Sequence, residues 1–261
     1  MRSLVTLGLI LGLGAAAFAS EPISLTYVVG SGYLVRQGDL VVAIDALTAY
    51  GVPTATRGVM QSAQPPFDVD LILVTHSDVD HFDAQLVSGN MTANPSAILV
   101  GPADVVRTVK AIAPQIDPAR CIVVQPGLET LVEQQFIGLF LEVFSFPHPP
   151  SGVPENVGYR LTFDGLVLTH PGDIDETRAA DDFTRTGWDH IPVDVAVLPL
   201  WFFDEAERSV LALTPAARYV PTHGSWSMLP WAYASAREAG VDVICLSRPL
   251  QQIWLTEAPG N

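Results

Sequence analysis

Residues 74–82 of the chain read VTHSDVDHF. This stretch places two imidazoles, His76 and His81, and two carboxylates, Asp78 and Asp80, directly after an apolar run that is typical of a buried strand. A loop that leaves the end of a strand can turn such closely spaced side chains towards one point. Imidazole and carboxylate groups are ligands for zinc, iron or manganese. The stretch therefore predicts a metal-binding loop, although a polar loop with helix-capping aspartates would have the same composition.

Three further residues of the same chemical types follow later in the chain. His148 ends a Phe-Pro-His sequence, Asp173 follows Pro-Gly, and His223 lies in Val-Pro-Thr-His-Gly. In this order the residues resemble the H-x-H-x-D-H signature, and the later His, Asp and His, of the metallo-β-lactamase superfamily. Asp78 stands where the second His of that signature usually stands. The resemblance runs from about residue 25 to residue 223, which is most of the chain.

The resemblance implies an α/β (α+β) fold, a four-layer αββα sandwich, with the ligands on loops along one edge of the two sheets. It implies a first metal held by His76, Asp78 and His148, a second metal held by Asp80, His81 and His223, and Asp173 as a bridge between them. In such a site a hydroxide shared by two cations attacks the substrate, and Asp80 would orient it or pass a proton to the leaving group. Asp45, at the end of the opening strand pair, would brace the metal loop.

The departure at Asp78 bears on the choice of metal. A carboxylate there adds negative charge and shifts the preference from zinc towards harder metals such as iron or manganese. The iron-binding flavodiiron branch of the superfamily also carries a carboxylate, a Glu, at this point. We expect no flavodoxin domain here to deliver electrons, so redox chemistry is the less favoured interpretation. We expect two divalent metal ions, with zinc favoured over iron or manganese. A single filled site, if Asp78 does not reach the first metal, and a degenerate non-catalytic site are the alternatives.

The expected activity is hydrolysis of an ester, lactone, amide or phosphoester bond in a small molecule. A true β-lactamase is less favoured because the second His is missing. The alternatives are a non-catalytic metal-binding or ligand-binding protein and an iron-dependent oxidoreductase. His170 is expected either to donate to a ligating carboxylate or to be structural, and Trp201 either to line the substrate pocket or to pack in the core. His190 is assigned no role.

Composition excludes several other classes of protein. The chain has 261 residues, with 13 Lys and Arg against 28 Asp and Glu, and a formal net charge of −15. Phosphate contacts need basic side chains, so the acidic balance argues against a nucleic-acid partner bound through its phosphates. Only two cysteines are present, Cys121 and Cys245, which excludes a disulfide-rich scaffold and a cysteine-based zinc site. We expect both to be buried free thiols, with a bridge between them as the alternative.

The first 20 residues have the pattern of a secretory signal peptide. Arg2 precedes an apolar run over residues 4–18, and the small-x-small sequence Ala-Phe-Ala ends at Ala19. The run is shorter than the roughly 20 residues that a membrane span needs, which favours a cleaved signal peptide over the alternative, an uncleaved N-terminal anchor. After cleavage no stable membrane insertion is expected. Residues 1–20 are therefore expected to be removed, leaving a single hydrolase domain over residues 21–261 in a periplasmic or secreted protein.

Hydrophobic patterns predict alternating strands and helices over the rest of the chain. The expected strands cover residues 23–29, 33–36, 40–44, 70–75, 97–100, 139–146, 157–163, 166–170, 193–198, 218–220 and 241–246. The expected helices begin near residue 82 and cover residues 103–112 and 230–238. This order predicts one domain with sheets inside and helices outside.

Overall fold

The structure is a computed structural model that describes residues 5–6, 21–125, 132–136, 138–148, 155–188, 192–204, 208–223, 229–238, 240–244 and 246–256. His190, Cys245 and all of the expected signal peptide except residues 5–6 lie outside these residues. Cys121 is a free, half-buried thiol. No helix within the described ranges combines the length and the apolar character that a membrane span requires.

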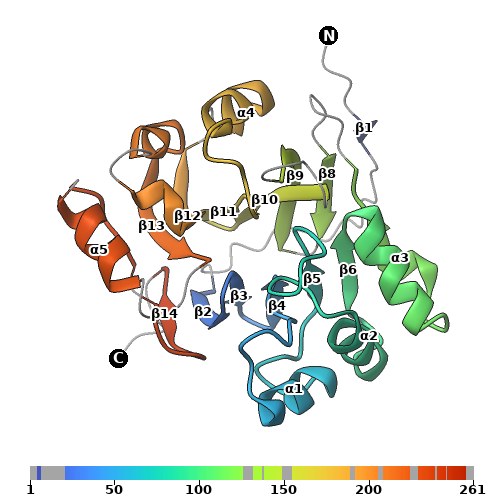
Figure 1. The fold of residues 1–261 in the computed structure, drawn as a ribbon. Coiled ribbons are helices and arrows are strands. Elements are labelled where there is room, and N and C mark those ends of the chain that lie inside the picture. The colour runs from blue at the N-terminus through green and yellow to red at the C-terminus, as the bar shows by residue number, and fades with distance from the viewer. Residues whose placement is uncertain are drawn as a thin grey trace.

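Two mixed β-sheets stack in the middle of the molecule (Figure 1). The first sheet has the order β14-β2-β3-β4-β5-β6-β7. Its strands are β2 (Ile23–Val29), β3 (Gly32–Gln37), β4 (Leu40–Ile44), β5 (Leu71–Leu73), β6 (Ile98–Gly101), β7 (Cys121–Val123) and β14 (Gln252–Trp254). The second sheet has the order β1-β8-β9-β10-β11-β12-β13. Its strands are β1 (Val5–Thr6), β8 (Val132–Phe136), β9 (Leu139–Pro147), β10 (Glu155–Phe163), β11 (Leu166–His170), β12 (Val193–Pro199) and β13 (Ala216–Thr222).

Helices cover the outer face of each sheet (Figure 1). Against the first sheet lie α1 (Thr54–Gln61), α2 (Ala84–Ala93) and α3 (Ala103–Ile112), and against the second lie α4 (Ala179–Thr186) and α5 (Leu229–Glu238). Short 3₁₀ helices are η1 (Pro118–Arg120), η3 (Leu200–Phe203) and η4 (Arg208–Leu213). The expected four-layer αββα sandwich is confirmed.

Alternation of side chains along the strands produces three separate apolar layers. In β10, Val157, Tyr159 and Leu161 point into the core between the two sheets. On the opposite face of the second sheet, Phe146 of β9 packs against Phe183 of α4. Because successive residues of a strand face opposite sides, a strand buried on both faces reads as a nearly continuous apolar run. This explains why the strand positions could be predicted from short apolar runs.

The chain direction of the strands determines where the loops gather. β4, β5 and β6 are parallel neighbours in the first sheet, and β11, β12 and β13 are parallel neighbours in the second. Carboxyl ends of parallel strands lie at the same edge of a sheet, which is where α/β proteins place ligand sites. Tyr159 ties the two sheets together near this edge, because its hydroxyl donates to the carbonyl of Val74 at 2.7 Å.

Several elements differ from the sequence prediction. The helix expected near residue 82 begins at Ala84, because the Asp83 carboxylate caps it by accepting the backbone N–H groups of Gln85 and Leu86. In the described part of the expected strand over residues 241–246, the pairing is a parallel bridge between Tyr219 and Val243. The sequence analysis did not predict β1, β7, β8, β14, α1 and α4, each of which is eight residues long or shorter.

Candidate metal centre

The structure brings together all seven side chains that the sequence predicted as ligands. Four of them follow β5 on one loop, and the others follow β9, β11 and β13 at the same edge of the molecule. They are His76, Asp78, Asp80, His81, His148, Asp173 and His223. Within each of three overlapping groups the potential ligand atoms lie within 4.8 Å of one another.

The first group contains His76, Asp78 and His148. The Oδ2 atom of Asp78 lies 3.4 Å from His148 Nε2 and 3.8 Å from His76 Nε2. The two imidazole rings are 4.8 Å apart between centroids. Asp78 therefore lies where it could serve as a ligand despite its short side chain.

The second group contains Asp80, His81 and His223. The Oδ2 atom of Asp80 lies 3.2 Å from His223 Nε2 and 3.9 Å from His81 Nε2. His223 has a positive φ of 61°, an uncommon conformation for a residue with a side chain. Its backbone N–H donates to the carbonyl of Gly30 at 3.4 Å, which anchors it to the turn between β2 and β3.

Asp173 lies between the two groups. Its Oδ1 is 3.3 Å from His81 Nε2, and its Oδ2 is 3.0 Å from His223 Nε2. The same Oδ2 lies 3.9 Å from the Nε2 atoms of both His76 and His148. Among the described residues, this is the carboxylate that faces imidazoles of both groups, as the position of a bridging ligand requires.

The donor atoms of this site fit a metal better than they fit one another. His76 Nε2, His81 Nε2, both ring nitrogens of His148 and Asp173 Oδ1 are buried, and none makes a hydrogen bond of acceptable geometry. Buried polar atoms without partners are costly, and native proteins leave few of them. Imidazole nitrogens and carboxylate oxygens facing one small space form the donor set of a divalent-metal site.

Asp45, a buried residue at the end of β4, binds the loop that carries the candidate metal ligands. It is 1 % exposed, and its carboxylate accepts the backbone N–H of Thr75 at 2.8 Å and the Thr75 hydroxyl at 2.7 Å. It also lies 2.8 Å from His81 Nδ1, so this nitrogen carries a proton and Nε2 faces the other ligands. A carboxylate behind a metal-facing His fixes the ring and its tautomer.

Without a cation, protonated histidines balance the negative charges of the aspartates in the site. Burial opposes the charged form of His81, but Asp45 and Asp173 outweigh it and raise the pKa of His81 to about 10. In the same way, hydrogen bonds to Asp173 and Asp80 overcome burial and raise the pKa of His223 to about 9. Burial and the nearby charge of His81 lower the pKa of His76 to about 3. Binding of a cation must therefore displace protons from His81 and His223.

The carboxylates respond in the opposite direction. Burial would raise the pKa of Asp173, but the imidazoles of His223 and His81 beside it hold that pKa well below its usual value. The hydrogen bond from His223 lowers the pKa of Asp80 by more than burial raises it. Both groups are ionised at neutral pH and present negative charge to the site.

The turn that carries Asp173 is held by a residue that the sequence did not reveal. Asn156 accepts the backbone N–H of Asp173 at 3.1 Å and donates to the carbonyl of Pro171 at 3.1 Å. Gly172 has a φ of 67°, and a Cβ there would lie 2.8 Å from the Cβ of Thr75. Only glycine fits at this close approach of the turn to the metal loop.

The two residues that the sequence left open also have defined positions. His170 contacts backbone atoms and does not donate to a ligating carboxylate. The Trp201 ring meets the His223 ring edge-on at 5.0 Å between centroids, and its Nε1 donates to the carbonyl of Ile174 at 3.2 Å. Trp201 is half-buried, so it packs against a candidate ligand and also reaches the surface.

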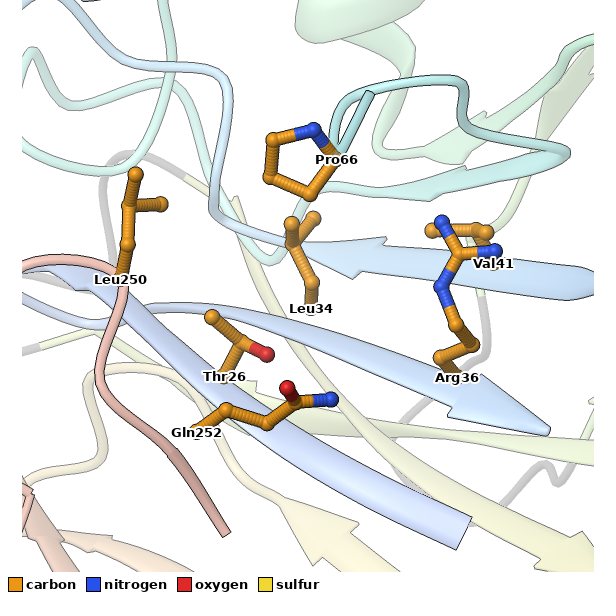
Figure 2. Close-up of a pocket in the computed structure, with 7 residues that line it drawn as sticks. All are labelled: Thr26, Leu34, Arg36, Val41, Pro66, Leu250 and Gln252. Atoms are coloured by element: carbon orange, nitrogen blue, oxygen red, sulfur yellow. The ribbon is translucent and has the colours of Figure 1, made fainter. Parts of the chain in front are cut away.

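Another hollow, shown in Figure 2, lies on the first sheet and shares no residue with the metal groups. It is lined by Thr26, Leu34, Arg36, Val41, Pro66, Leu250 and Gln252. The charged group in this lining, Arg36, is paired with Asp68 at 2.9 Å. The hollow has no convergent set of ionisable side chains, so the metal groups are the better candidate for chemistry.

Comparison with known proteins is consistent with this geometry. Residues 24–201 match the model of the beta-lactamase superfamily domain. The matched segment contains six of the seven clustered residues, and His223 lies beyond it. No curated protein matches the sequence.

Solved structures share the fold at low sequence identity. Igni18, a metallo hydrolase from Ignicoccus hospitalis KIN4/I, is 17% identical with a TM-score of 0.65, covering 89% of this chain and 97% of its own. CmlA, a diiron β-hydroxylase from Streptomyces venezuelae, is 11% identical with a TM-score of 0.60, covering 90% of this chain and 54% of its own. The short form of human tRNase Z is 14% identical with a TM-score of 0.54, covering 90% of this chain and 100% of its own.

These structural likenesses bear on the fold alone, and the family match covers more than half of the sequence. Among these neighbours, Igni18 is a metallo hydrolase and CmlA is a diiron β-hydroxylase. The chain therefore belongs to the metallo-β-lactamase superfamily.

Proposed function

We propose that the protein is an exported metal-dependent hydrolase that cleaves an ester, lactone, amide or phosphoester bond of a small molecule. The observation that carries the proposal is the convergence of four histidines and three aspartates, several with buried atoms that lack hydrogen-bond partners. A divalent cation bound there would supply a Lewis acid that polarises the scissile bond and makes water acidic enough to attack at neutral pH.

Asp80 is the proposed catalytic residue. Its carboxylate is about a third exposed, whereas His81 and Asp173 are buried. The interaction with His223, whose Nε2 lies 3.2 Å from Asp80 Oδ2, lowers the pKa of Asp80 and keeps it ionised, so it can accept a proton from water. Its Oδ2 would orient the attacking water and then return the proton to the leaving group. The other carboxylates are held deeper and have positioning or ligand roles.

Two ions, with zinc favoured, are the proposed metal content. The donor set has four imidazoles and no thiolate, which suits zinc, iron or manganese. Asp78 adds a third carboxylate to the set and increases its affinity for the harder metals. Elemental analysis of the purified protein identifies the metal, and zinc, iron and manganese are the candidates.

The second candidate is an iron-dependent oxidoreductase. Two observations favour it: the carboxylate of Asp78 in the first group, and the shared fold of CmlA, which is a diiron β-hydroxylase. A non-catalytic metal-binding protein would keep the same ligands and show no turnover.

Export rests on the apolar run and the small-x-small sequence before residue 20. We propose cleavage near Ala19 and a periplasmic or secreted location, with a small molecule as the substrate. N-terminal sequencing of protein from the native host checks this directly. A chain that still starts at Met1 in the cytoplasm would contradict it.

The activity is tested with metal-free protein reconstituted with zinc, iron or manganese. Each form is given p-nitrophenyl esters, lactones and a p-nitrophenyl phosphodiester. We expect hydrolysis that a chelator abolishes, and a fall in kcat of about 10²–10⁴-fold in Asp80→Asn. Asp68→Asn, the same change at a half-exposed surface pair, should have no effect. Absence of hydrolysis with every metal would favour the non-catalytic alternative, and oxygen consumption by the iron form alone would favour the oxidoreductase.

A further inference from the structure

The turn at Gly30 and Ser31, between β2 and β3, contacts two of the loops that carry metal-site residues. The carbonyl of Gly30 accepts the Thr222 hydroxyl at 3.1 Å and the His223 backbone N–H at 3.4 Å. The carbonyl of Ser31 lies 3.0 Å from His170 Nε2. This turn of the first sheet is therefore bound to the ends of β13 and β11 in the second sheet.

His170 extends this connection to Asp173. It is the last residue of β11, it is completely buried, and its Nδ1 accepts the backbone N–H of Gly172 at 3.1 Å. Since a carbonyl oxygen can only accept, Nε2 must donate to Ser31 and Nδ1 must be the unprotonated nitrogen. Both ring nitrogens are thus used, and one neutral tautomer satisfies both bonds. Among the contacts of the described residues, neither nitrogen reaches a ligand atom.

The consequence is a fixed distance between Asp173, which lies between the two groups, and His223 of the second group. Asp173 follows Gly172 directly, and His223 follows Thr222 directly. Both pairs are anchored to the same turn, and Asp173 Oδ2 lies 3.0 Å from His223 Nε2. Gly172 cannot shift freely, because it lies close to Thr75 at a positive φ.

We propose that His170 is a positioning residue that holds Asp173 and His223 at the spacing needed by the second metal group. The proposal rests on the metal centre of the proposed function. His170 acts through the backbone of Gly172 and through Ser31, so it sets geometry and does not touch metal or substrate. The first group depends on it less, because His76, Asp78 and His148 come from loops that His170 does not bind.

The test is a zinc titration of the metal-free full-length protein against a chromophoric chelator, which gives two stepwise dissociation constants. His170→Leu removes both hydrogen bonds. His170→Gln keeps a donor of similar reach for the Ser31 carbonyl. Asn90→Leu is the matched control, since the Asn90 amide is also buried and donates to two backbone carbonyls, those of Met60 and Phe67, away from the site. Chemical unfolding of each metal-free variant is measured in parallel.

For His170→Leu we expect one of the two zinc dissociation constants to rise about 10–100-fold, and the other to change by less than about threefold. His170→Gln should fall between His170→Leu and the wild type. Asn90→Leu should lose stability but keep both zinc constants. If His170→Leu does not fold, His170→Gln alone must show the selective loss.

Three results would overturn the proposal. Unchanged zinc constants in the His170 variants would show a structural role only, and equal losses at both steps would show general loosening. A selective loss in Asn90→Leu would show that destabilisation itself is the cause. If the wild type binds fewer than two zinc ions, the two-metal proposal fails together with this one. If it binds two and the His170 variants match it, only the role of His170 fails.

Discussion

Replacement of Asp45 by asparagine tests whether the metal loop depends on the carboxylate beneath it. The amide has the same shape, and Asn tolerates the positive φ of 49° found at this position. Its Oδ1 can still accept the backbone N–H of Thr75. Its NH₂ group, however, would face His81 Nδ1, which now lies 2.8 Å from a carboxylate oxygen. The Nδ1 atom of His81 would then have to accept a hydrogen bond from this amide. The ring proton would move to Nε2, the nitrogen that faces the metal site, and would block metal binding there.

The size of both effects follows from burial. Asp45 and His81 are each 1 % exposed, and removing one partner of a buried pair costs about 3–5 kcal/mol. Asp173 still faces His81 at 3.3 Å, so we expect the low end, about 3 kcal/mol, in the free energy of unfolding of the metal-free protein. Loss of the residue that orients a metal ligand typically weakens metal binding about 10–100-fold.

Urea unfolding of the metal-free protein and zinc competition against a chelator measure the two effects separately. Asp68→Asn provides the control, because its pair with Arg36 is half-exposed and contributes at most about 1 kcal/mol. If Asp45→Asn matched Asp68→Asn in both stability and zinc affinity, then the bracing role of Asp45 and the tautomer assigned to His81 would be wrong.

Three further predictions concern the same site. When zinc, iron and manganese are offered in equal amounts, Asp78→His should bind a larger share of zinc than the wild type, because imidazole is softer than carboxylate and uncharged. An unchanged ratio of bound metals would show that Asp78 is not a ligand. Gly172→Ala should lower the free energy of unfolding by at least about 1–2 kcal/mol, because of its positive φ and the approach to Thr75; a neutral effect in urea unfolding would show that the turn can move. The metal-free protein should lose stability as the pH rises from about 6.5 to about 10. The pKa values of His81 and His223, about 10 and about 9, lie above that of an unfolded histidine, so their stabilising contribution is complete below about pH 6.5 and is lost as they deprotonate. A Tm that stays flat or rises over this window would contradict these raised pKa values.

The clustered residues could be predicted because their order resembles the family signature, histidines are scarce in this chain, and their positions follow apolar runs. His76, Asp173 and His223 each come directly after or close to a strand end, and parallel strands bring such ends together. The bracing position of Asp45 was also anticipated from the resemblance. What the sequence could establish was thus the order of the candidate ligands and the edge at which they meet.

The supporting contacts could not be predicted, because their partners are backbone atoms far away in the sequence. His170 and Ser31 are separated by 139 positions, and nothing in the local pattern of either residue indicates the other. The expectation that His170 donates to a ligating carboxylate differs from the contacts found. Asn156 likewise looks like an ordinary polar strand residue, until the turn that carries Asp173 is seen to fold over it. Trp201 packs against the ring of His223, and the expectation that it lines a substrate pocket stays a prediction.

The most direct test of the account is the metal content of the purified protein, measured by elemental analysis beside Asp173→Ala. Asp173 faces imidazoles of both groups, so the account predicts about two divalent ions per wild-type chain and about one or fewer in the variant. The variant should remain folded, because the apolar core between the sheets lies away from this edge. A wild-type protein without stoichiometric metal, or an Asp173→Ala protein that keeps the full wild-type content, would contradict the central claim.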